Sequence, residues 1–491
     1  MRRRAPAAEA WAVRLALVAK ALGQGSPTVA VAADGPGRAA RPLLDPKDPS
    51  EIWLTLAVMS GRLPDNQLVQ ATALASRFDR GESLDKAIRS LSTPSSLARQ
   101  VVLPEPGDVL VDVATTLDSP FTTGIQRVVR ESVMRWIRDH GARPITWTTT
   151  LSCTRLLRPH EQELMEKGLA PDPTVRQPRG QQPALVVPWE CTYILPEVVG
   201  EYSRSVLLQP LARYSRCRTG AVGYDVVAVT SAETRGGHDN EHFLEYLNAL
   251  QPFDAITPIS RASEAEFEGW HQALAGAGLT GPELREVTLP ASIHPASEEA
   301  REEFAAVFDD SSGPVVLVVG SHEPRKNHLA VLHAAELLWR RGHVFTLCFL
   351  GARSWGGKEF RENVADLQAA DRSLLMLGGV DDDILAAAYT HARFSVFPSL
   401  NEGFGLPVAE SLALGTPVIT SNFGSMAQIA EGGGALTVDP RDDYALSEAM
   451  EALLGDDLVL STLEKEAAAR PKRTWDDYAR ETWEVLTGRL A

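Results

Sequence analysis

The sequence has little cysteine, no excess of basic residues and no long apolar run. Its four cysteines in 491 residues lie far apart and include no C-x-x-C pair, which argues against a disulfide framework or a zinc knuckle and is typical of a reducing cytoplasm. The 48 basic side chains are outnumbered by 64 acidic ones, giving a net charge of −16. A nucleic-acid partner is therefore not expected, although a local basic patch remains compatible with this total.

The N-terminal segment comes closest to a membrane segment. MRRRAPAAEAWAVRLALVAKALG begins basic and becomes apolar, but Arg14 and Lys20 interrupt the apolar run. The run is too short to span a bilayer and makes a poor signal peptide. We expect a frayed amphipathic helix, with contact at the membrane surface as the open alternative. The predicted location is cytoplasmic, with the inner face of the membrane as the second choice.

Composition and periodicity divide the chain into five segments. Residues 1–48 are predicted to be a flexible segment, because 24–50 is rich in Gly, Ala, Pro and Asp without a sustained period. Residues 49–99 have a helical period and predict a small helical module of unknown role. Residues 107–295 and 311–470 alternate short β-branched runs with helical stretches, and 471–491 form an amphipathic helix with aromatic residues at helical spacing.

The two long segments predict an α/β fold with two doubly wound parallel sheets. Unbroken apolar runs of four to six residues, separated by helices, are typical of parallel strands that are covered on both faces. The expected strands are 108–113, 144–149, 184–188, 222–229, 255–260 and 286–290 in the first half, and 315–320, 345–350, 374–379, 394–398, 417–420 and 434–438 in the second. Ligands of such sheets bind beyond the carboxyl ends of the strands.

A basic loop follows the first strand of the second half. In VVLVVGSHEPRKNHLAVL, Arg325 and Lys326 precede a helix that is predicted to start near Asn327. Free backbone N–H groups and the helix dipole favour an anion there, and two cations would strengthen a phosphate site. The alternative is a pair of solvated cations. The loop is not an H-E-x-x-H zinc motif, because His322 and His328 are six residues apart.

A glycine-rich loop with two nearby glutamates follows a later strand, in FPSLNEGFGLPVAE. Gly403 and Gly405 would let the backbone approach a ligand closely. Glu402 lies in the loop and Glu410 one turn into the next helix, where both could accept hydrogen bonds from sugar hydroxyls. The alternatives are a solvated loop carboxylate and a first-turn carboxylate that complements the helix dipole.

The run FPSLNEGFGLPVAESLALGTPVITSNFGS resembles the signature of retaining glycosyltransferases of family 4, which have the GT-B fold. EPRKN resembles the R-K-x loop of that family, and LGGVDDDILAAAYTHA resembles its nucleobase-pocket stretch. The resemblance extends from about Val315 to Asp439, with a weaker first half. It implies two Rossmann-like domains that face a cleft and a C-terminal helix that packs back towards the first domain.

The resemblance also implies a role for each matching residue. Lys326 and Arg325 would neutralise the diphosphate leaving group, and Glu402 would contact hydroxyls of the transferred sugar. Ser321 stands where many members carry an arginine, so one diphosphate cation is missing or is replaced by Arg325. The implied donor-binding residues are Ser321, Gly403, Phe404, Gly405, Leu406, Val380 and Glu410, the last of which would hold the ribose.

Four residues of the first half are candidates for the acceptor side. DVLVDVATTLDSPFTTGIQRVVRESVMRWI resembles the first βα unit of the family, so Gly124 and Arg127 would contact the acceptor or the diphosphate; a solvated arginine face is the alternative. Tyr224 stands where the family often has a cleft histidine, Asp225 is kept, and His238 could substitute for the missing ring.

The implied function is a retaining, metal-independent hexosyltransferase without a cofactor. It would move a mannose-like hexose from a GDP or UDP sugar to a hydroxyl of a glycan, lipid-linked or small-molecule acceptor, in polysaccharide, glycolipid or glycoside biosynthesis. Asp381-Asp382-Asp383 is interpreted as a helix N-cap with acidic neighbours, not as a metal-binding D-x-D. A non-catalytic sugar-nucleotide or glycan-binding relative is the alternative, and a dinucleotide oxidoreductase would need a G-x-G-x-x-G that is missing.

Overall fold

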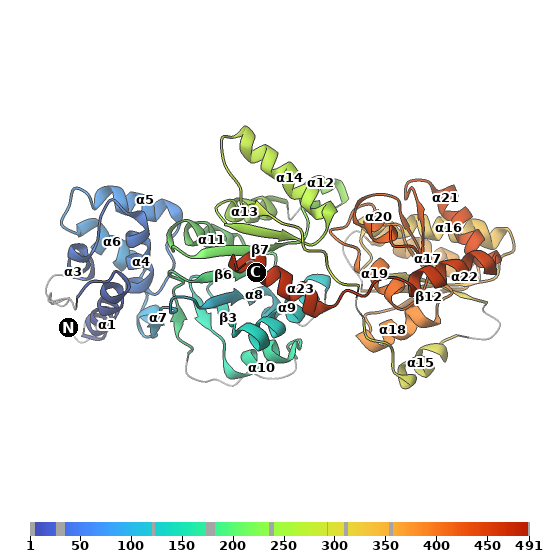
Figure 1. Cartoon of the computed structure of the whole chain (residues 1–491), viewed down its shortest axis with the longest axis horizontal. Coiled ribbons are helices and arrows are strands. Elements are labelled where there is room, and N and C mark those ends of the chain that lie inside the picture. The colour runs from blue at the N-terminus through green and yellow to red at the C-terminus, as the bar shows by residue number, and fades with distance from the viewer. Residues whose placement is uncertain are drawn as a thin grey trace.

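The computed structural model describes residues 5–25, 35–119, 123–172, 182–234, 240–291, 293–308, 313–352 and 357–489. Figure 1 shows an elongated molecule in which a helical module, a first α/β domain and a second α/β domain follow one another. His238 lies outside the described residues, so its proposed substitution for the cleft histidine stays a prediction.

The helical module is larger than the sequence pattern indicates. It consists of α1 (Ala5–Ala21), α3 (Pro36–Ala40), η1 (Arg41–Leu43), α4 (Pro49–Ser60), α5 (Asn66–Ala75), α6 (Glu82–Leu91) and α7 (Pro94–Leu97). Trp11, Leu15 and Val18 are buried in its core. The expectation of a flexible or frayed segment over 1–48 is therefore wrong for α1 and α3.

Arg14 explains how α1 is held. The side chain that interrupts the apolar run is 3% exposed and donates to the carbonyl oxygens of Met59, Ser96 and Arg99 at 3.0, 2.6 and 2.9 Å. These carbonyls lie at the ends of α4 and α7, where backbone acceptors lack helical partners. Arg14 interrupts the apolar run in the sequence, yet its guanidinium is buried and donates to the free carbonyls at the helix ends on which α1 packs.

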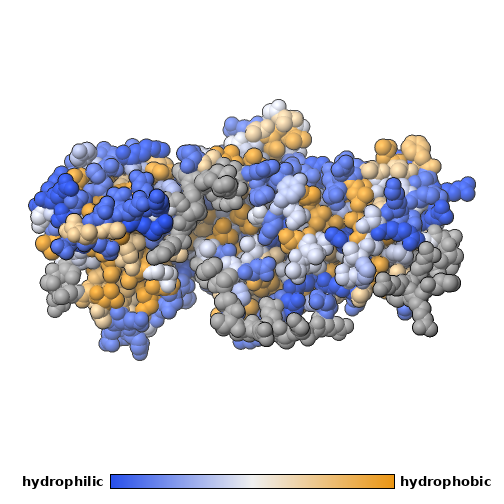
Figure 2. All heavy atoms as spheres, turned by 180° about the vertical axis from the view of Figure 1, so that it is seen from behind, coloured by the Kyte–Doolittle hydropathy of each residue, from blue (hydrophilic) through white to orange (hydrophobic). Residues whose placement is uncertain are grey.

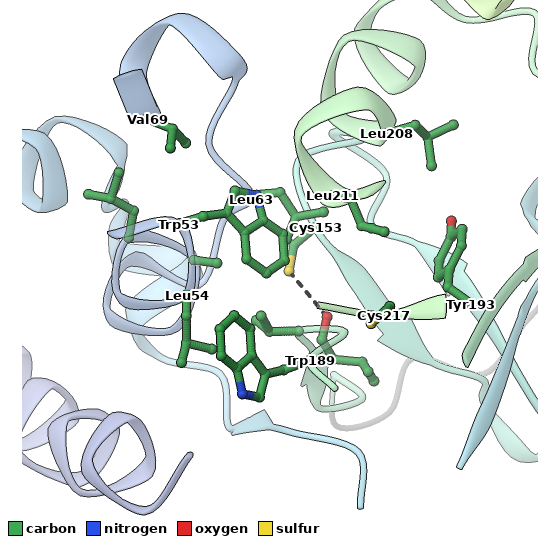
Figure 3. Close-up of a cluster of buried hydrophobic side chains, with 14 of the residues drawn as sticks. Trp53, Leu54, Leu63, Val69, Cys153, Trp189, Tyr193, Leu208, Leu211 and Cys217 are labelled. Atoms are coloured by element: carbon green, nitrogen blue, oxygen red, sulfur yellow. Dashed lines mark hydrogen bonds between the residues drawn. The ribbon is translucent and has the colours of Figure 1, made fainter. Parts of the chain in front are cut away.

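The module shares one apolar core with the first α/β domain. Trp53, Leu54, Leu63 and Val69 of the module face Cys153, Trp189, Leu208, Leu211 and Cys217 of the domain, as Figure 3 shows. Trp53 is fully buried there. Burial of large apolar side chains is the main stabilising term in such contacts, so we infer that the module is a fixed part of the molecule.

The first α/β domain contains a mixed sheet. Within the described residues the strand order is β1-β5-β4-β3-β2-β6-β7-β8-β9, and β4 is antiparallel to both β3 and β5. The strands are β1 (Val101–Val102), β2 (Val109–Asp112), β3 (Arg143–Trp147), β4 (Thr154–Leu156), β5 (Leu185–Val186), β6 (Thr192–Leu195), β7 (Arg218–Gly223), β8 (Ala255–Pro258) and β9 (Glu283–Leu284). The helices are α8 (Ala114–Asp118), α9 (Gly124–His140), α10 (Pro159–Lys167), α11 (Tyr202–Tyr214), α12 (Val227–Thr230), η2 (Ala232–Thr234), α13 (Asn240–Leu250) and α14 (Arg261–Gly276).

Two expected strands of this domain differ from the structure. The run 222–229 was predicted as one strand, but β7 ends at Gly223 and α12 begins at Val227. Carboxylates cause the break, since Val226 N donates to Glu266 and Val227 N donates to Asp225. The run 286–290 follows the short strand β9 and is not itself a strand, although Val287 N still donates to Pro258 O.

The second α/β domain has a regular sheet. Its described strands are all parallel, in the order β12-β11-β10-β13-β14-β15. They are β10 (Val315–Val319), β11 (Thr346–Leu350), β12 (Leu374–Leu377), β13 (Phe394–Phe397), β14 (Val418–Ser421) and β15 (Ala435–Val438), as predicted. The helices are α15 (Glu298–Ala305), η4 (Pro324–Lys326), α16 (His328–Arg340), α17 (Lys358–Ala369), α18 (Asp382–His391), α19 (Leu406–Ala413), α20 (Gly424–Ala430), α21 (Asp443–Gly455) and α22 (Asp457–Ala468).

The chain crosses between the two domains twice. The segment expected only to join them carries α15, which packs on α18 and so belongs to the second domain. After α22, helix α23 (Trp475–Thr487) returns to the first domain, where Figure 1 shows it beside α9. There Trp136 Nε1 donates to Ala479 O at 2.8 Å, and the Arg218 guanidinium donates to Leu486 O at 3.0 Å.

The surface gives no sign of a membrane span. None of the described helices combines the length and the apolar character that crossing a bilayer requires. Figure 2 shows hydrophilic and hydrophobic side chains interspersed over the rear face of the molecule.

Candidate active site

Lys326 and Arg325 form ion pairs with one carboxylate, Glu402, beyond the carboxyl ends of two strands of the second sheet. Because β10 and β13 are neighbours, the loops that follow them lie side by side. Lys326 Nζ lies 2.6 Å from Glu402 Oε1, and the Arg325 guanidinium lies 2.6 Å from Glu402 Oε2. The two loops that the sequence singled out separately therefore form one site.

Backbone and hydroxyl contacts fasten these two loops together. Leu400 N donates to Arg325 O at 2.8 Å, and Arg325 donates to Asn401 O at 2.6 Å. The hydroxyl of Ser399 donates to Glu402 Oε1 at 2.8 Å, and Lys326 Nζ lies 4.8 Å from the centre of the Phe397 ring. Both charged groups of the ion pair are thus held at defined positions before any ligand binds.

Electrostatics keep Glu402 ionised although its side chain is only 11% exposed. Burial alone would raise the pKa of this carboxyl, but the charges of Lys326 and Arg325 outweigh burial and hold the pKa at about 2. The same carboxylate raises the pKa of Arg325. The site accordingly holds two cations and two carboxylates, because Glu323 also lies 3.3 Å from Arg325, so a diphosphate would compete with these carboxylates for the cations.

The loop Gly403-Phe404-Gly405 packs against the first domain. Ser260 and Ser263 at the start of α14 donate to Gly403 O at 2.5 and 2.9 Å. A Cβ on Gly403 would lie 2.5 Å from Tyr224 O and 3.0 Å from an Asp225 carboxylate oxygen, closer than real contacts allow. Only glycine at position 403 leaves room for the loop to lie this close to the first domain. Ser260 also caps α14, since its hydroxyl accepts from Ser263 N at 3.0 Å.

Two further members of this loop have different local roles. Gly405 has φ = 100°, a left-handed conformation that starts α19 and that glycine adopts without strain. Phe404 is buried between the domains, in a cluster that includes Tyr224 and Phe397. Its ring therefore contributes to packing, whereas its backbone lies in the loop.

Glu410 lies on α19 and is bound by residues from two other elements. Its Oε1 pairs with the Arg127 guanidinium of α9, and Tyr389 on α18 donates to its Oε2 at 3.3 Å. Arg127 also pairs with Asp382. Burial raises the pKa of Glu410 to about 6, because the nearby Arg127 charge only partly offsets it. The alternative of a solvated arginine face is wrong for Arg127, whose side chain is 13% exposed.

The acceptor-side candidates divide into two kinds. Gly124 lies against Leu406, since a Cβ on Gly124 would be 3.0 Å from the leucine Cδ1. Burial raises the pKa of Asp225 to about 6, opposed by the charge of Arg325 across the domain boundary. Tyr224 is different: its hydroxyl donates to Pro196 O at 2.7 Å and its side chain is buried. Its ring belongs to the core and does not replace a cleft histidine.

The remaining donor-side candidates, Ser321 and Val380, form no direct hydrogen bond or ion pair with Lys326, Glu402 or Glu410 in the part of the chain that the structure describes. The hydroxyl of Ser321 donates to Glu323 Oε1 at 2.6 Å, and Glu323 Oε2 lies 3.3 Å from Arg325. Val380 lies in the loop between β12 and α18, partly exposed. Ser321 therefore reaches the site through a carboxylate that the sequence analysis did not single out.

Each aspartate of the D-x-D-like triplet has a partner within the protein. Asp381 caps α18 by accepting from Ile384 N at 2.9 Å, which confirms the predicted N-cap. Asp382 pairs with Arg127, and Asp383 accepts from Ser297 Oγ at 2.6 Å. Across the described ranges, no group of three or more His, Cys, Asp or Glu residues is arranged to hold a metal ion.

A fully buried ion cluster lies under the strand ends of the first domain. Arg204 reaches Asp112 at 3.0 Å and Glu197 at 2.6 Å, and all three side chains are fully buried. Glu197 accepts from Thr115 N and Thr116 N at 2.8 and 3.0 Å, which holds the start of α8. The cluster thus positions the chain that leads into α9 and Arg127.

The structure adds residues to the site that the sequence reasoning missed. They are Glu323, Ser399 and Tyr389 as contacts of the named residues. Glu323 and Ser399 had a signal, because they lie two residues before Arg325 and three residues before Glu402 in the quoted motifs. Tyr389 contacts Glu410 from another helix, and Asp382, Ser260 and Ser263 contact residues of the other domain, so only the strand order and the meeting of the two domains bring them to the site.

Comparisons with known proteins bear on the family of the second domain and on the fold. Residues 299–472 match the model of the family Glycosyl transferases group 1. The structure of HepE from Anabaena in complex with UDP superposes with a TM-score of 0.56 at 13% identity, covering 78% of this chain and 100% of that one. The chain has the GT-B fold.

Two curated relatives come from Escherichia coli. The serotype-specific mannosyltransferase WbdA is 33% identical over 121 residues, which are 25% of this chain and 15% of WbdA. The O-antigen chain mannosyltransferase B is 32% identical over 168 residues, which are 34% of this chain and 44% of that protein. The chain thus spans less than half the length of both relatives.

Proposed function

We propose that this protein is a retaining glycosyltransferase that moves a hexose from a nucleotide diphosphate sugar to a hydroxyl acceptor. The observation that carries the proposal is the convergence of Lys326 and Arg325 on Glu402, at adjoining strand ends that face the first domain. The family match over 299–472 includes all three residues. Two cations in a largely buried site at these strand ends are suited to bind a diphosphate.

The charges lead to a mechanism. Breaking the glycosyl–phosphate bond places negative charge on the diphosphate and positive charge on the anomeric carbon. Lys326 and Arg325 neutralise the first, and a preorganised site supplies this stabilisation without rearrangement. The acceptor oxygen forms its bond on the face that the diphosphate leaves, and a departing phosphate oxygen takes the acceptor proton. In this proposal no metal ion or cofactor is required.

Glu402 and Glu410 hold different parts of the donor in this proposal. With its two cations drawn towards the diphosphate, Glu402 accepts hydrogen bonds from hydroxyls of the transferred sugar. Glu410 accepts from the ribose hydroxyls, which requires it to release Arg127. The backbone N–H groups of 403–405 face the sugar and the diphosphate, and Asp225 and Gly124 line the opposite, acceptor side.

The names of similar proteins support a narrower guess about the substrates. Both relatives from Escherichia coli are mannosyltransferases, and the Anabaena structure holds UDP. We therefore propose a mannose-like hexose on a GDP or UDP donor and a glycan, lipid-linked or small-molecule acceptor in the biosynthesis of a polysaccharide or glycoconjugate.

A thermal-shift panel of nucleoside diphosphates, followed by nucleotide release with acceptors present, tests the proposal. A ligand that binds only the folded state raises the melting temperature. We expect either UDP or GDP to stabilise the wild type and to stabilise Lys326→Ala less, because the free diphosphate carries the charge that Lys326 neutralises in the leaving group. The matched control Lys358→Ala removes a lysine of α17 that is 83% exposed. A panel in which no nucleoside diphosphate stabilises the protein would overturn the proposal.

One observation favours a second candidate, a sugar-nucleotide or glycan-binding protein without turnover. Ser321 stands at a position where the family often has an arginine, and it is bonded to Glu323. Such a protein would bind a nucleoside diphosphate yet release none from its sugar conjugate with any acceptor. Release of nucleotide at a measurable rate decides for the transferase.

A further inference from the structure

Two cysteines lie side by side on the edge of the first sheet that faces away from the candidate active site. Cys191 immediately precedes β6 and Cys217 immediately precedes β7, and the register pairs Thr192 with Arg218. The two residues are therefore opposite one another on adjacent parallel strands. Their sulfur atoms are 3.4 Å apart.

This geometry is compatible with a covalent bond. Neighbouring strands lie about 4.7–4.9 Å apart, within the roughly 4.4–6.8 Å range between the Cα atoms of a disulfide. Rotation of the thiols has to bring the sulfur atoms to about 2.05 Å. Arg218 N donates to Cys191 O at 2.9 Å, which fastens the two backbones together on the sheet side of the pair.

The turns that lead into the two strands have the same shape. Glu190 and Arg216, the residues just before the cysteines, both adopt positive φ, at 49° and 54°. Glu190 N donates to Ser215 O at 3.0 Å, and the Arg216 guanidinium lies 3.1 Å from the Glu190 carboxylate. The cysteines thus lie directly beneath a partly exposed ion pair. Each is itself slightly exposed, Cys191 at 6% and Cys217 at 8%.

The two thiols are electrostatically unequal. Burial would raise the pKa of Cys217, but hydrogen bonds with Cys191 and Ser215 outweigh burial and lower it. The hydrogen bond with Cys217, and then burial, raise the pKa of Cys191. The hydrogen bond between the two thiols favours the thiolate of one of them, and we assign this attacking role to Cys217, whose backbone N also donates to the Ser215 hydroxyl at 3.2 Å.

We propose that Cys191 and Cys217 are a redox-active dithiol that a small disulfide oxidant, such as glutathione disulfide, converts to an intrachain disulfide. The thiolate of Cys217 attacks one sulfur of the oxidant, forms a mixed disulfide and releases one glutathione thiolate. Cys191, after losing its proton, attacks the Cys217 sulfur and releases the second glutathione. Two protein thiols are oxidised and one glutathione disulfide is reduced to two thiols.

The position of the pair gives the reaction a structural consequence. Arg216 also reaches Asp48 of the helical module at 2.7 Å and lies 4.9 Å from the centre of the Trp189 ring. Figure 3 shows Trp189 and Cys217 in the cluster that joins the module to the domain. A disulfide between residues 26 apart constrains the unfolded chain, so oxidation stabilises the edge of the first domain on which the module packs.

The chain provides its own controls. Cys153 and Cys348 are fully buried, and burial raises the pKa of each to about 12. The thiol of Cys153 contacts a backbone carbonyl, Val186 O, at 3.7 Å. Neither should react with glutathione disulfide in the folded protein.

The test incubates the full-length protein with glutathione disulfide, then unfolds it, alkylates the free thiols and maps them by mass spectrometry. We expect a cross-linked pair of peptides containing Cys191 and Cys217, lost on reduction, and alkylation of Cys153 and Cys348. In Cys191→Ser, Cys217 should keep a bound glutathione. Full alkylation of all four cysteines, or a cross-link that includes Cys153, would overturn the proposal.

A second measurement does not depend on the variants. Oxidised wild-type protein should melt several degrees above its reduced form, whereas Cys348→Ser should show the same redox shift as the wild type. An oxidised, cross-linked protein that melts no higher than the reduced one would refute the stabilising role at the edge on which the module packs.

Discussion

Glu402 and Glu410 have seven residues between them, in one loop and the helix that follows it, yet their surroundings are opposite. Glu402 is held by two cations of its own domain, and its pKa falls to about 2. Glu410 is held by one cation from the other domain and by Tyr389, and its pKa rises to about 6. The first site is complete within a single domain, and the second depends on how the two domains meet.

This difference suggests a division of labour. A carboxylate with two fixed counter-ions keeps its charge at every physiological pH and preserves the geometry of the cations around it. A carboxylate whose partner comes from another domain can exchange that partner for a ligand. We infer that Glu402 and its two cations act in the chemical step (the Glu402 end) and that Glu410 acts in donor recognition (the Glu410 end). Mutations at the Glu402 end should therefore change mainly kcat, and mutations at the Glu410 end mainly KM.

The largest effect is expected for Lys326→Ala. Loss of an ammonium that stabilises the leaving diphosphate should lower kcat by about 100- to 1,000-fold, while Arg325 continues to balance Glu402 and preserves the fold. Steady-state release of nucleotide from the donor measures this, with Lys358→Ala as the control. Wild-type kcat in Lys326→Ala would remove the proposed chemistry from this end.

Glu402→Gln should reduce kcat by roughly 10- to 100-fold, because hydrogen bonds to a charged acceptor contribute about 1.5–3 kcal/mol. Nucleoside diphosphate affinity should be maintained, since the amide no longer competes with the diphosphate for Lys326 and Arg325. Calorimetry and turnover are compared with Glu362→Gln, an exposed control on α17. Loss of nucleotide binding without loss of kcat would reverse the assignment of the two ends.

Glu410→Ala should raise the KM for the donor by about tenfold and change kcat little, because the ribose is held equally in the ground and transition states. Donor titrations at saturating acceptor measure both constants. An unchanged donor KM would contradict the ribose role of Glu410.

Donor affinity should also depend on pH through Glu410. Because burial raises the pKa of this carboxyl to about 6, it is protonated below that pH and loses the charge that accepts from ribose hydroxyls. Affinity should therefore fall severalfold between pH 7 and pH 5. The phosphates of the ligand titrate in the same range, so Glu410→Gln, which retains that titration, provides the baseline. Identical pH profiles for both proteins would exclude the effect.

Much of the second domain could be predicted from the sequence, because its signals are local. Unbroken apolar runs predicted β10 to β15, and the loops after β10 and β13 were identified as sites before their adjacency was known. The first domain was harder. β7, RTGAVG, has two glycines and an arginine and shows no clear strand pattern. β6, TYIL, is rich in β-branched and aromatic residues and is a strand that the sequence reasoning missed.

The helical module and the domain contacts show where local reasoning ends. The Gly- and Pro-rich run before Asp45 favours a linker, but α3 forms there because Gly37 fits against Asp85, where a Cβ would lie 2.0 Å from the backbone nitrogen. Arg127 was placed correctly at a helix start, but its partners on α19 and α18 are more than 250 positions away. Such pairs follow from domain closure, which no local pattern encodes.

The smallest effect is expected for Arg127→Ala, and it tests whether the Glu410 end exchanges partners. In the ligand-free protein Arg127 occupies the carboxylate that the ribose is proposed to take, so binding the donor must break this largely buried pair. Removing the guanidinium removes that cost but also raises the pKa of Glu410 further. The affinity for the nucleoside diphosphate should therefore rise about threefold at alkaline pH, where Glu410 is ionised in both proteins. Calorimetry measures the change, with Arg135→Ala on the same helix as the control. Weaker binding by Arg127→Ala would mean that Arg127 itself contacts the donor. Glu402 and Glu410 would then differ in which domain supplies the paired cation, and not in whether that cation is released when the donor binds.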